Sequence, residues 1–186
     1  MADTQKYRLA TAAERSAGIV LLLVVVEFLD QLLGAGLDRF GIIPWTEAGL
    51  VGILFAPVLH GGFGHLAANV GPLFILLLIL FWNRKYYPER TVILIWLLSG
   101  IGTWVIGRRM AVHIGASSIV FGLVSYLIVA AIWMACWRAL FFSILVFVLF
   151  GGLFYGLFQI EQGVSWEGHL SGAIAGFWVA WINHKR

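Results

Sequence analysis

Apolar stretches alternate with short polar or glycine-rich segments along the chain. A helix needs about 20 mainly apolar residues to cross the hydrocarbon core of a bilayer. Six stretches come close to that length, and we expect membrane-spanning helices over residues 17–37, 63–82, 91–107, 116–137, 138–158 and 168–182. The pattern predicts an all-α polytopic membrane protein, in which an N-terminal segment, residues 1–16, precedes a single six-helix transmembrane domain, residues 17–186.

The segment between the first two predicted spans, residues 38–62, is apolar but poorly suited to a continuous helix. Its helix-breaking residues are Gly41, Pro44, Gly49, Gly52, Pro57, Gly61 and Gly62. It also carries aromatic side chains such as Phe40 and Trp45, and tryptophan is typical of the membrane–water interface. We therefore expect a membrane-interface loop with short helical pieces between helices 1 and 2.

Composition excludes a soluble protein. Only 11% of the 186 residues are charged and 61% are hydrophobic, whereas a soluble domain has about 25% charged residues. Membrane lipids are therefore the expected surroundings. The basic excess lies mostly in predicted loops, which suits an orientation signal better than nucleic-acid binding, so we expect no nucleic-acid partner.

Loop charges predict the orientation, because lysine and arginine concentrate in cytoplasmic loops. Nine basic residues fall on one side and three on the other. The nine are Lys6, Arg8, Arg15, Arg84, Lys85, Arg90, Arg138, Lys185 and Arg186, and the three are Arg39, Arg108 and Arg109. Both termini are therefore expected in the cytoplasm, and the second, fourth and sixth spans begin at the other face.

Four polar residues lie at the starts of these three spans. His65 and Asn69 are four residues apart, so they share one face of the second span. Ser117 is in the first turn of the fourth span and His169 in the first turn of the sixth. Polar groups at membrane depth usually face the protein interior or a water-filled cavity. We therefore expect these side chains to lie at similar depth, near the non-cytoplasmic face.

This set of residues suits acyl transfer. Histidine is the usual base that activates a serine hydroxyl, so Ser117 and His169 form a candidate dyad. Asn69, a ring nitrogen of His65 and backbone N–H groups could stabilise an oxyanion. Glu167 is expected on a different face of the helix from His169, and we therefore predict a dyad rather than a triad.

Small residues predict close packing of the fourth and sixth spans. Gly168, Gly172 and Gly176 recur every four residues, and such stripes let helices approach each other. Gly115 and Gly122 offer a matching surface. Contact between these helices would bring Ser117 and His169 together.

With these motifs the chain resembles the rhomboid family of intramembrane serine proteases. His65 and Asn69 match its H-x-x-x-N motif, Gly115-Ala116-Ser117 its G-x-S motif, and His169-Leu170-Ser171-Gly172-Ala173-Ile174-Ala175-Gly176 its H-x-x-G-x-x-x-G motif. The segments 40–44 and 163–170 resemble a short bacterial branch of the family. The three motifs occur in the family's order, which makes the resemblance specific.

The resemblance implies an intramembrane endopeptidase of the bacterial plasma membrane that cleaves transmembrane segments of other proteins. Ser117 would be the nucleophile, His169 the general base, and His65 and Asn69 the oxyanion donors. His60 would hold the loop before the second span. The resemblance implies no cofactor. The family most often has glycine after the nucleophile, where this chain has Ser118.

Other interpretations remain open at the level of sequence. Ser117 alone could be a helix N-cap, Ser118 is a rival nucleophile, and His113 is interpreted as loop structure. A metal site is disfavoured because the chain lacks a His-Glu-x-x-His motif. The loop 159–167 is a candidate lid. The whole protein could also be an inactive relative that binds transmembrane segments, or a small transporter or channel, and the sequence does not indicate its oligomeric state.

Overall fold

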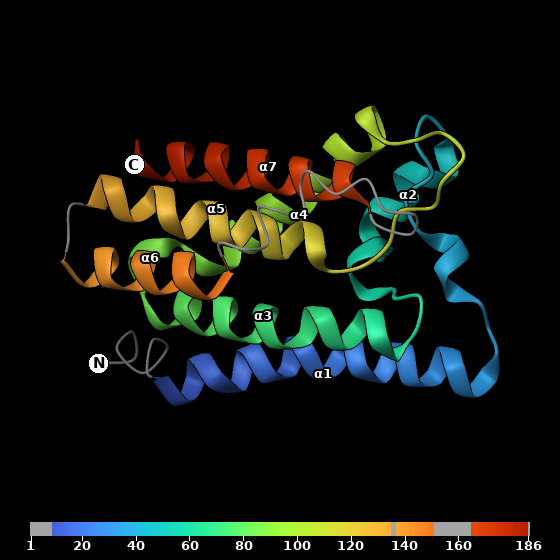
Figure 1. Cartoon of the computed structure of the whole chain (residues 1–186), viewed down its shortest axis with the longest axis horizontal. Helices are drawn as coiled ribbons and strands as arrows, with labels where there is room; N and C mark the ends of the chain where they lie inside the picture. The colour runs from blue at the N-terminus through green and yellow to red at the C-terminus, as the bar shows by residue number, and fades with distance from the viewer. Residues whose placement is uncertain (1–8, 135–136, 151–164, 186) are drawn as a thin grey trace.

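The computed structural model describes residues 9–134, 137–150 and 165–185 (Figure 1). Within these ranges the regular elements are helices. In addition, Ile42 and His113 form an isolated antiparallel β-bridge. The α-helices are α1 (Leu9–Leu33), α2 (Glu47–Phe55), α3 (Phe63–Trp82), α4 (Pro88–Ile106), α5 (Ser117–Met134), α6 (Trp137–Phe150) and α7 (Trp166–His184). The 3-10 helices are η1 (Leu37–Phe40), η2 (Ala56–Val58) and η3 (Arg84–Tyr86). The predicted all-α class is confirmed.

The long helices run along a common direction, with α2 and the longer described loops at one end and the C-terminus of α7 at the other (Figure 1). The helix α5 lies at the centre and packs most extensively against α7. Further contacts join α4 to α7 and α1 to α3. The closely packed pair of α5 and α7 therefore carries both residues of the predicted dyad.

Within the described ranges, four helical segments are long and apolar enough to cross a membrane: α1, α3, η3 with α4, and α5. They match the first four predicted spans. The helices α6 and α7 lie at the predicted fifth and sixth positions, but the count of six spans stays a prediction. The last part of the fifth span and most of the predicted lid, residues 151–164, fall outside the described ranges.

The first helix differs from its predicted bounds, since α1 begins at Leu9 rather than residue 17 and ends at Leu33 rather than residue 37. Alanine, leucine, glutamate and arginine favour helix in the segment 9–15, and Arg15 pairs with Glu89 of α4 at 2.5 Å. Gly34 then adopts a φ of +58°, which leaves the helical region. The predicted boundary at residue 17 followed polarity and missed the helix propensity of the polar segment.

Close packing of α5 against α7 explains two of the glycines. A Cβ atom at Gly172 would lie 2.0 Å from the carbonyl oxygen of Ser118, and one at Gly176 would lie 2.0 Å from that of Gly122. No side chain fits at such distances, so the predicted helix contact is confirmed for this pair. Gly168 instead faces Ser165, which caps its own helix.

The segment 38–62 contains short helices, as expected. Two tryptophans of α4 hold it in place: Trp96 Nε1 donates to the carbonyl of Ile53 at 2.7 Å, and Trp104 Nε1 donates to that of Thr46 at 2.9 Å. The segment therefore packs against α4 at the end of the bundle where α5 begins. Its location at a membrane interface stays a prediction.

Candidate active site

A cavity of about 530 Å³ lies among α3, the loop before α5, and the first turns of α5 and α7. Ser117, His169, His65 and Asn69 all line it. The structure thus brings the four polar residues, from three helices, around one space. Arg108 and His113 of the preceding loop also line it.

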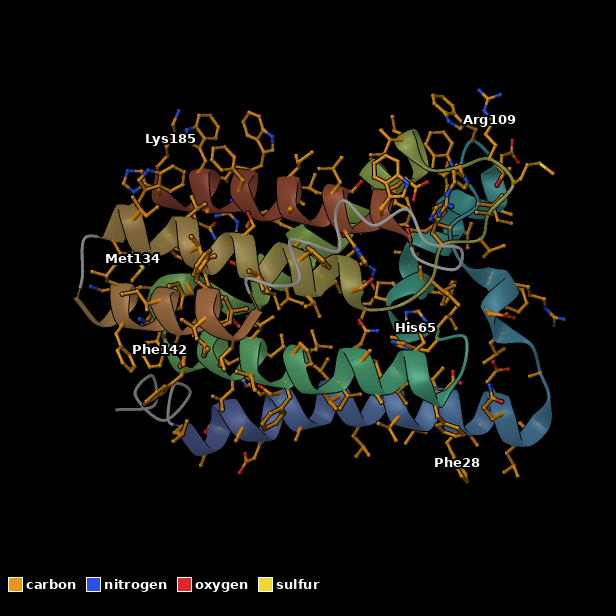
Figure 2. All side chains as sticks on the ribbon, viewed as in Figure 1. Phe28, His65, Arg109, Met134, Phe142 and Lys185 are labelled. Carbon is orange, nitrogen blue, oxygen red and sulfur yellow. The ribbon has the colours of Figure 1, made fainter. Side chains whose placement is uncertain are left out.

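The turn before Ser117 has a backbone that requires glycine. Gly115 has a φ of +105°, which side chains rarely adopt. A Cβ atom here would lie 2.7 Å from both Cε1 and Nε2 of His65. The absence of a side chain therefore lets the His65 ring, at the loop end of α3 (Figure 2), pack directly against the turn that leads to Ser117.

Backbone bonding at the start of α5 bears on whether Ser117 is a helix cap. The N–H of Val120 donates to the carbonyl of Ala116 at 3.0 Å. The residue that accepts the first intrahelical bond is the N-cap, so the cap position is Ala116 and Ser117 lies inside the first turn. In α7, by contrast, the Ser165 side chain caps the helix by accepting from Gly168 N–H at 3.2 Å.

His169 is held against α5 by an aromatic stack. Its ring lies on that of Phe121 with centroids 4.2 Å apart and planes 14° apart. Phe121 is four residues after Ser117, and residues with this spacing share one helix face. The stack therefore holds the imidazole over the face of α5 that carries the serine. Sequence analysis did not select Phe121, although its spacing from Ser117 was visible.

His65 and Asn69 are joined within α3. The Asn69 Nδ2 donates to the carbonyl of His65 at 2.8 Å and keeps a second N–H. The Nδ1 of His65 accepts from Gly61 N–H at 3.4 Å. A neutral imidazole that accepts at Nδ1 carries its proton on Nε2, and Nε2 lies on the side of Gly115. Two side-chain N–H donors are thus available near the start of α5.

His60 connects the loop before α3 to the start of α5. Its Nε2 accepts from the N–H of Ala116 at 3.4 Å, and its ring packs edge-on against His65 with centroids 5.1 Å apart. Burial, together with the smaller effect of repulsion from His65, lowers the pKa of His60 to about 4. The ring is therefore neutral at physiological pH and can accept the hydrogen bond from the residue next to Ser117.

Ser118 faces away from the large cavity. Its hydroxyl accepts from Ser99 of α4 at 3.4 Å, and its carbonyl packs against Gly172 of α7. Ser117 lines the cavity that His169 shares, and Ser118 does not. Of the two serines, Ser117 therefore is the one placed beside His169.

Comparison with known proteins identifies the family. The model of the Rhomboid domain matches residues 47–186. The chain belongs to the rhomboid family. It is 37% identical over 172 residues to the uncharacterized proteins Rv1337 of Mycobacterium tuberculosis and Mb1372 of Mycobacterium bovis, covering 88% of this chain and 71% of each relative. It is 35% identical over 169 residues to the uncharacterized protein ML1171 of Mycobacterium leprae, covering 87% of this chain and 67% of that relative.

This rhomboid carries an ion pair with a buried carboxylate that sequence analysis did not find. Arg108 Nε lies 2.7 Å from Glu167 Oε1, and Nη2 donates to Oε2 at 3.4 Å. The Glu167 side chain is fully buried, while that of Arg108 is 45% exposed. Glu167 is two residues before His169 and pairs with Arg108 of the loop before α5. Nothing in local spacing indicates a pair separated by 59 positions.

His113 fastens the same loop to α7 and to the segment before α2. Its Nδ1 and the Ser165 Oγ lie 2.6 Å apart. Its backbone N–H donates to Ile42 O at 2.8 Å and its carbonyl accepts from Ile42 N–H at 2.9 Å. Burial lowers the pKa of His113, and the nearby Glu167 opposes this shift. These contacts agree with its interpretation as loop structure.

The described part of this rhomboid contains no group of three or more His, Cys, Asp or Glu side chains placed to hold a metal ion. The three histidines His60, His65 and His169 contact Ala116, Gly115 and Phe121 respectively.

Proposed function

We propose that this rhomboid is an intramembrane serine endopeptidase that cleaves transmembrane segments of other proteins with a Ser117–His169 dyad. The observation that carries the proposal is the shared cavity of about 530 Å³, which Ser117, His169, His65 and Asn69 all line. Acyl transfer needs a hydroxyl, an imidazole and N–H donors arranged around one space, and these four residues supply them.

The first half of the reaction forms an acyl-enzyme. Ser117 Oγ attacks the scissile carbonyl carbon while His169 takes the hydroxyl proton. The negative oxygen of the tetrahedral intermediate accepts hydrogen bonds from the second Asn69 N–H, from His65 Nε2–H and from backbone N–H groups of α5. His169 then gives its proton to the leaving amine as the C–N bond breaks.

Water completes the cycle. It attacks the ester carbonyl while His169 removes its proton, and the proton returns to Ser117 Oγ when the carboxylic acid leaves. The Phe121 stack keeps the imidazole in one orientation through both halves. The cavity supplies room for the water beside polar side chains.

The distribution of loop charges predicts the side of the membrane on which the site opens. We infer that both termini are cytoplasmic in a bacterial plasma membrane, so the site opens toward the non-cytoplasmic side. A substrate segment would enter laterally and unwind near that face to present a carbonyl.

Covalent labelling tests the proposal. A fluorophosphonate should react with wild type and with Ser118→Ala, and peptide mapping should locate the adduct on Ser117. Ser117→Ala and His169→Ala should lose labelling and cleavage of a model transmembrane substrate while retaining the wild-type unfolding temperature. An inactive relative that only binds transmembrane segments would leave wild type unlabelled. An adduct on Ser118, or full cleavage by Ser117→Ala, would overturn the assignment.

A further inference from the structure

Arg108 brings a permanent positive charge to the cavity of the candidate active site. Among the described residues that line this cavity, it is the one with a permanently charged side chain. That side chain is 45% exposed. Arg108 belongs to the loop between α4 and α5, at the end of the bundle where α5 begins (Figure 1). A cation is therefore presented to a substrate that occupies the cavity beside Ser117.

The ion pair with Glu167 uses one edge of the Arg108 guanidinium. Nε lies 2.7 Å from Oε1, and Nη2 donates to Oε2 at 3.4 Å. A guanidinium carries five N–H groups in a planar fork, so its other edge, formed by Nη1 and Nη2, can pair with a second carboxylate. The Glu167 side chain is fully buried and does not line the cavity. The cavity therefore meets the cation rather than its compensating anion.

The wall around Arg108 combines apolar side chains with neutral polar groups. Ala68, Pro72, Val120 and Phe121 line the cavity together with the serine, asparagine and histidine side chains of the candidate site. Apolar walls lower the local dielectric constant and strengthen a nearby charge interaction. Of the described lining residues, Arg108 is therefore the strongest partner for a negatively charged group.

We propose that Arg108 makes this rhomboid prefer transmembrane segments that carry an aspartate or a glutamate close to the scissile bond. This preference rests on the proposed endopeptidase function, whose substrates it specifies. The substrate carboxylate accepts charge-assisted hydrogen bonds from the Arg108 guanidinium. A carboxylate at membrane depth is costly unless it is paired, so the contact stabilises an acidic segment in the cavity more than a neutral one.

Glu167 distinguishes this role of Arg108 from a purely structural one. Its negative charge offsets part of the positive charge that a substrate carboxylate meets. Glu167→Gln should therefore strengthen the preference for an acidic substrate, whereas loss of the Arg108 charge should abolish it. An ion pair that serves stability alone predicts no change in substrate preference in either case.

Cleavage of paired model substrates by the full chain in lipid bilayers tests the proposal. A transmembrane segment with a mapped scissile bond carries either aspartate or asparagine at one residue beside that bond, and kcat/KM is measured for both forms. The ratio of the two values cancels differences in the amount of folded enzyme. We expect wild type to favour aspartate about five- to tenfold at the best position, because water partly screens the exposed guanidinium. Glu167→Gln should raise this ratio roughly twofold or more.

The double variant Arg108→Gln/Glu167→Gln removes both charges, so no unpaired carboxylate stays buried. Its ratio should fall to about one, because no cation remains to pair with the substrate. Arg109→Gln is the matched control and should keep the wild-type ratio. The Arg109 guanidinium lies over the Trp45 ring at 5.5 Å and does not line the cavity, and Figure 2 shows this side chain at the outer edge of the molecule.

Equal kcat/KM for aspartate and asparagine at every tested position in wild type would overturn the preference and leave the proposed function intact. So would an aspartate preference that survives in the double variant, one that Arg109→Gln also abolishes, or one that Glu167→Gln weakens. If wild type neither cleaved any of the substrates nor reacted with a fluorophosphonate, the proposed function itself would be overturned, and the preference with it.

Discussion

The His169 ring stacks on Phe121 at a centroid distance of 4.2 Å, and Phe121 follows Ser117 by one turn of α5. The catalytic base of the proposed dyad is thus oriented by a side chain of the helix that carries the nucleophile. The backbones of the same two helices touch through Gly172 and Gly176. Small residues set the separation of the helices, and an aromatic face sets the rotation of the imidazole.

Removing the aromatic face should lower the rate of the chemical step. Phe121→Leu keeps most of the apolar volume but lets the His169 ring turn, and we expect kcat to fall by up to about 100-fold with a small change in KM. Phe121→Tyr keeps the stack and should retain most of the activity. Phe177→Leu, at an exposed ring of α7, is the control. Wild-type kcat in Phe121→Leu would mean that the stack does not orient the base.

The substitution Gly115→Ala should disturb the candidate active site for two reasons. The positive φ strains any side chain by about 1–3 kcal/mol, and the new Cβ would meet the His65 ring at 2.7 Å. We expect Gly115→Ala to lower both the unfolding temperature and the rate of substrate cleavage.

Gly64→Ala provides the control for this change, because nothing lies within 4 Å of its Cβ position. This helical position should gain about 0.5–1 kcal/mol of stability and keep its activity. Similar behaviour of the two alanine variants would show that the turn before Ser117 tolerates a side chain.

Much of the candidate site could be predicted from the sequence, because each of its residues follows from a local rule. Helix periodicity places His65 and Asn69 on one face, and loop charge places the starts of three spans on one side. Together these two rules predict that Ser117 and His169 lie close to His65 and Asn69. In the structure all four residues line one cavity. The glycines that recur every four residues on α7 likewise predict a close contact between the backbones of α7 and α5.

The contacts that sequence analysis missed are those without a local rule. Arg108 and Glu167 are 59 positions apart, and His113 and Ser165 are 52 apart. Each pair depends on how the loop before α5 folds over α7, which no spacing specifies. Ser118 is a related case, since its position gave no indication that its hydroxyl would face Ser99 of α4.

The Arg108–Glu167 pair should show an asymmetric effect on stability. Arg108→Gln leaves the buried carboxylate without its cation, which should cost about 3 kcal/mol in the free energy of unfolding. Glu167→Gln should cost less, because the partly exposed guanidinium can turn to water. Reversible unfolding of both single variants and the double variant measures the coupling.

Arg109→Gln is the matched control for this series. Its guanidinium lies over Trp45 at 5.5 Å, and we expect a loss of about 0.5 kcal/mol or less. A larger loss in Glu167→Gln than in Arg108→Gln would contradict the assignment of Glu167 as the desolvated partner.

Stability should fall on mild acidification because of His60. Its pKa is about 4 in the folded protein against 6.5 for the unperturbed group, so between these values the unfolded chain binds a proton that the folded chain does not. The neutral ring's contribution is therefore fully present above about pH 6.5 and is lost as pH falls toward 4, by up to about 3 kcal/mol. His113, whose pKa is also lowered, contributes a slope of the same sign.

Unfolding free energies measured from pH 4.5 to 7.5 test this prediction. His60→Gln retains an acceptor for the Ala116 N–H but cannot take up a proton, so its stability should depend less steeply on pH than that of wild type. A slope from His113 should persist in this variant. An unchanged slope in His60→Gln would show that the pKa of His60 is the same in the folded and the unfolded chain, and a buried neutral ring that accepts from Ala116 would then be contradicted.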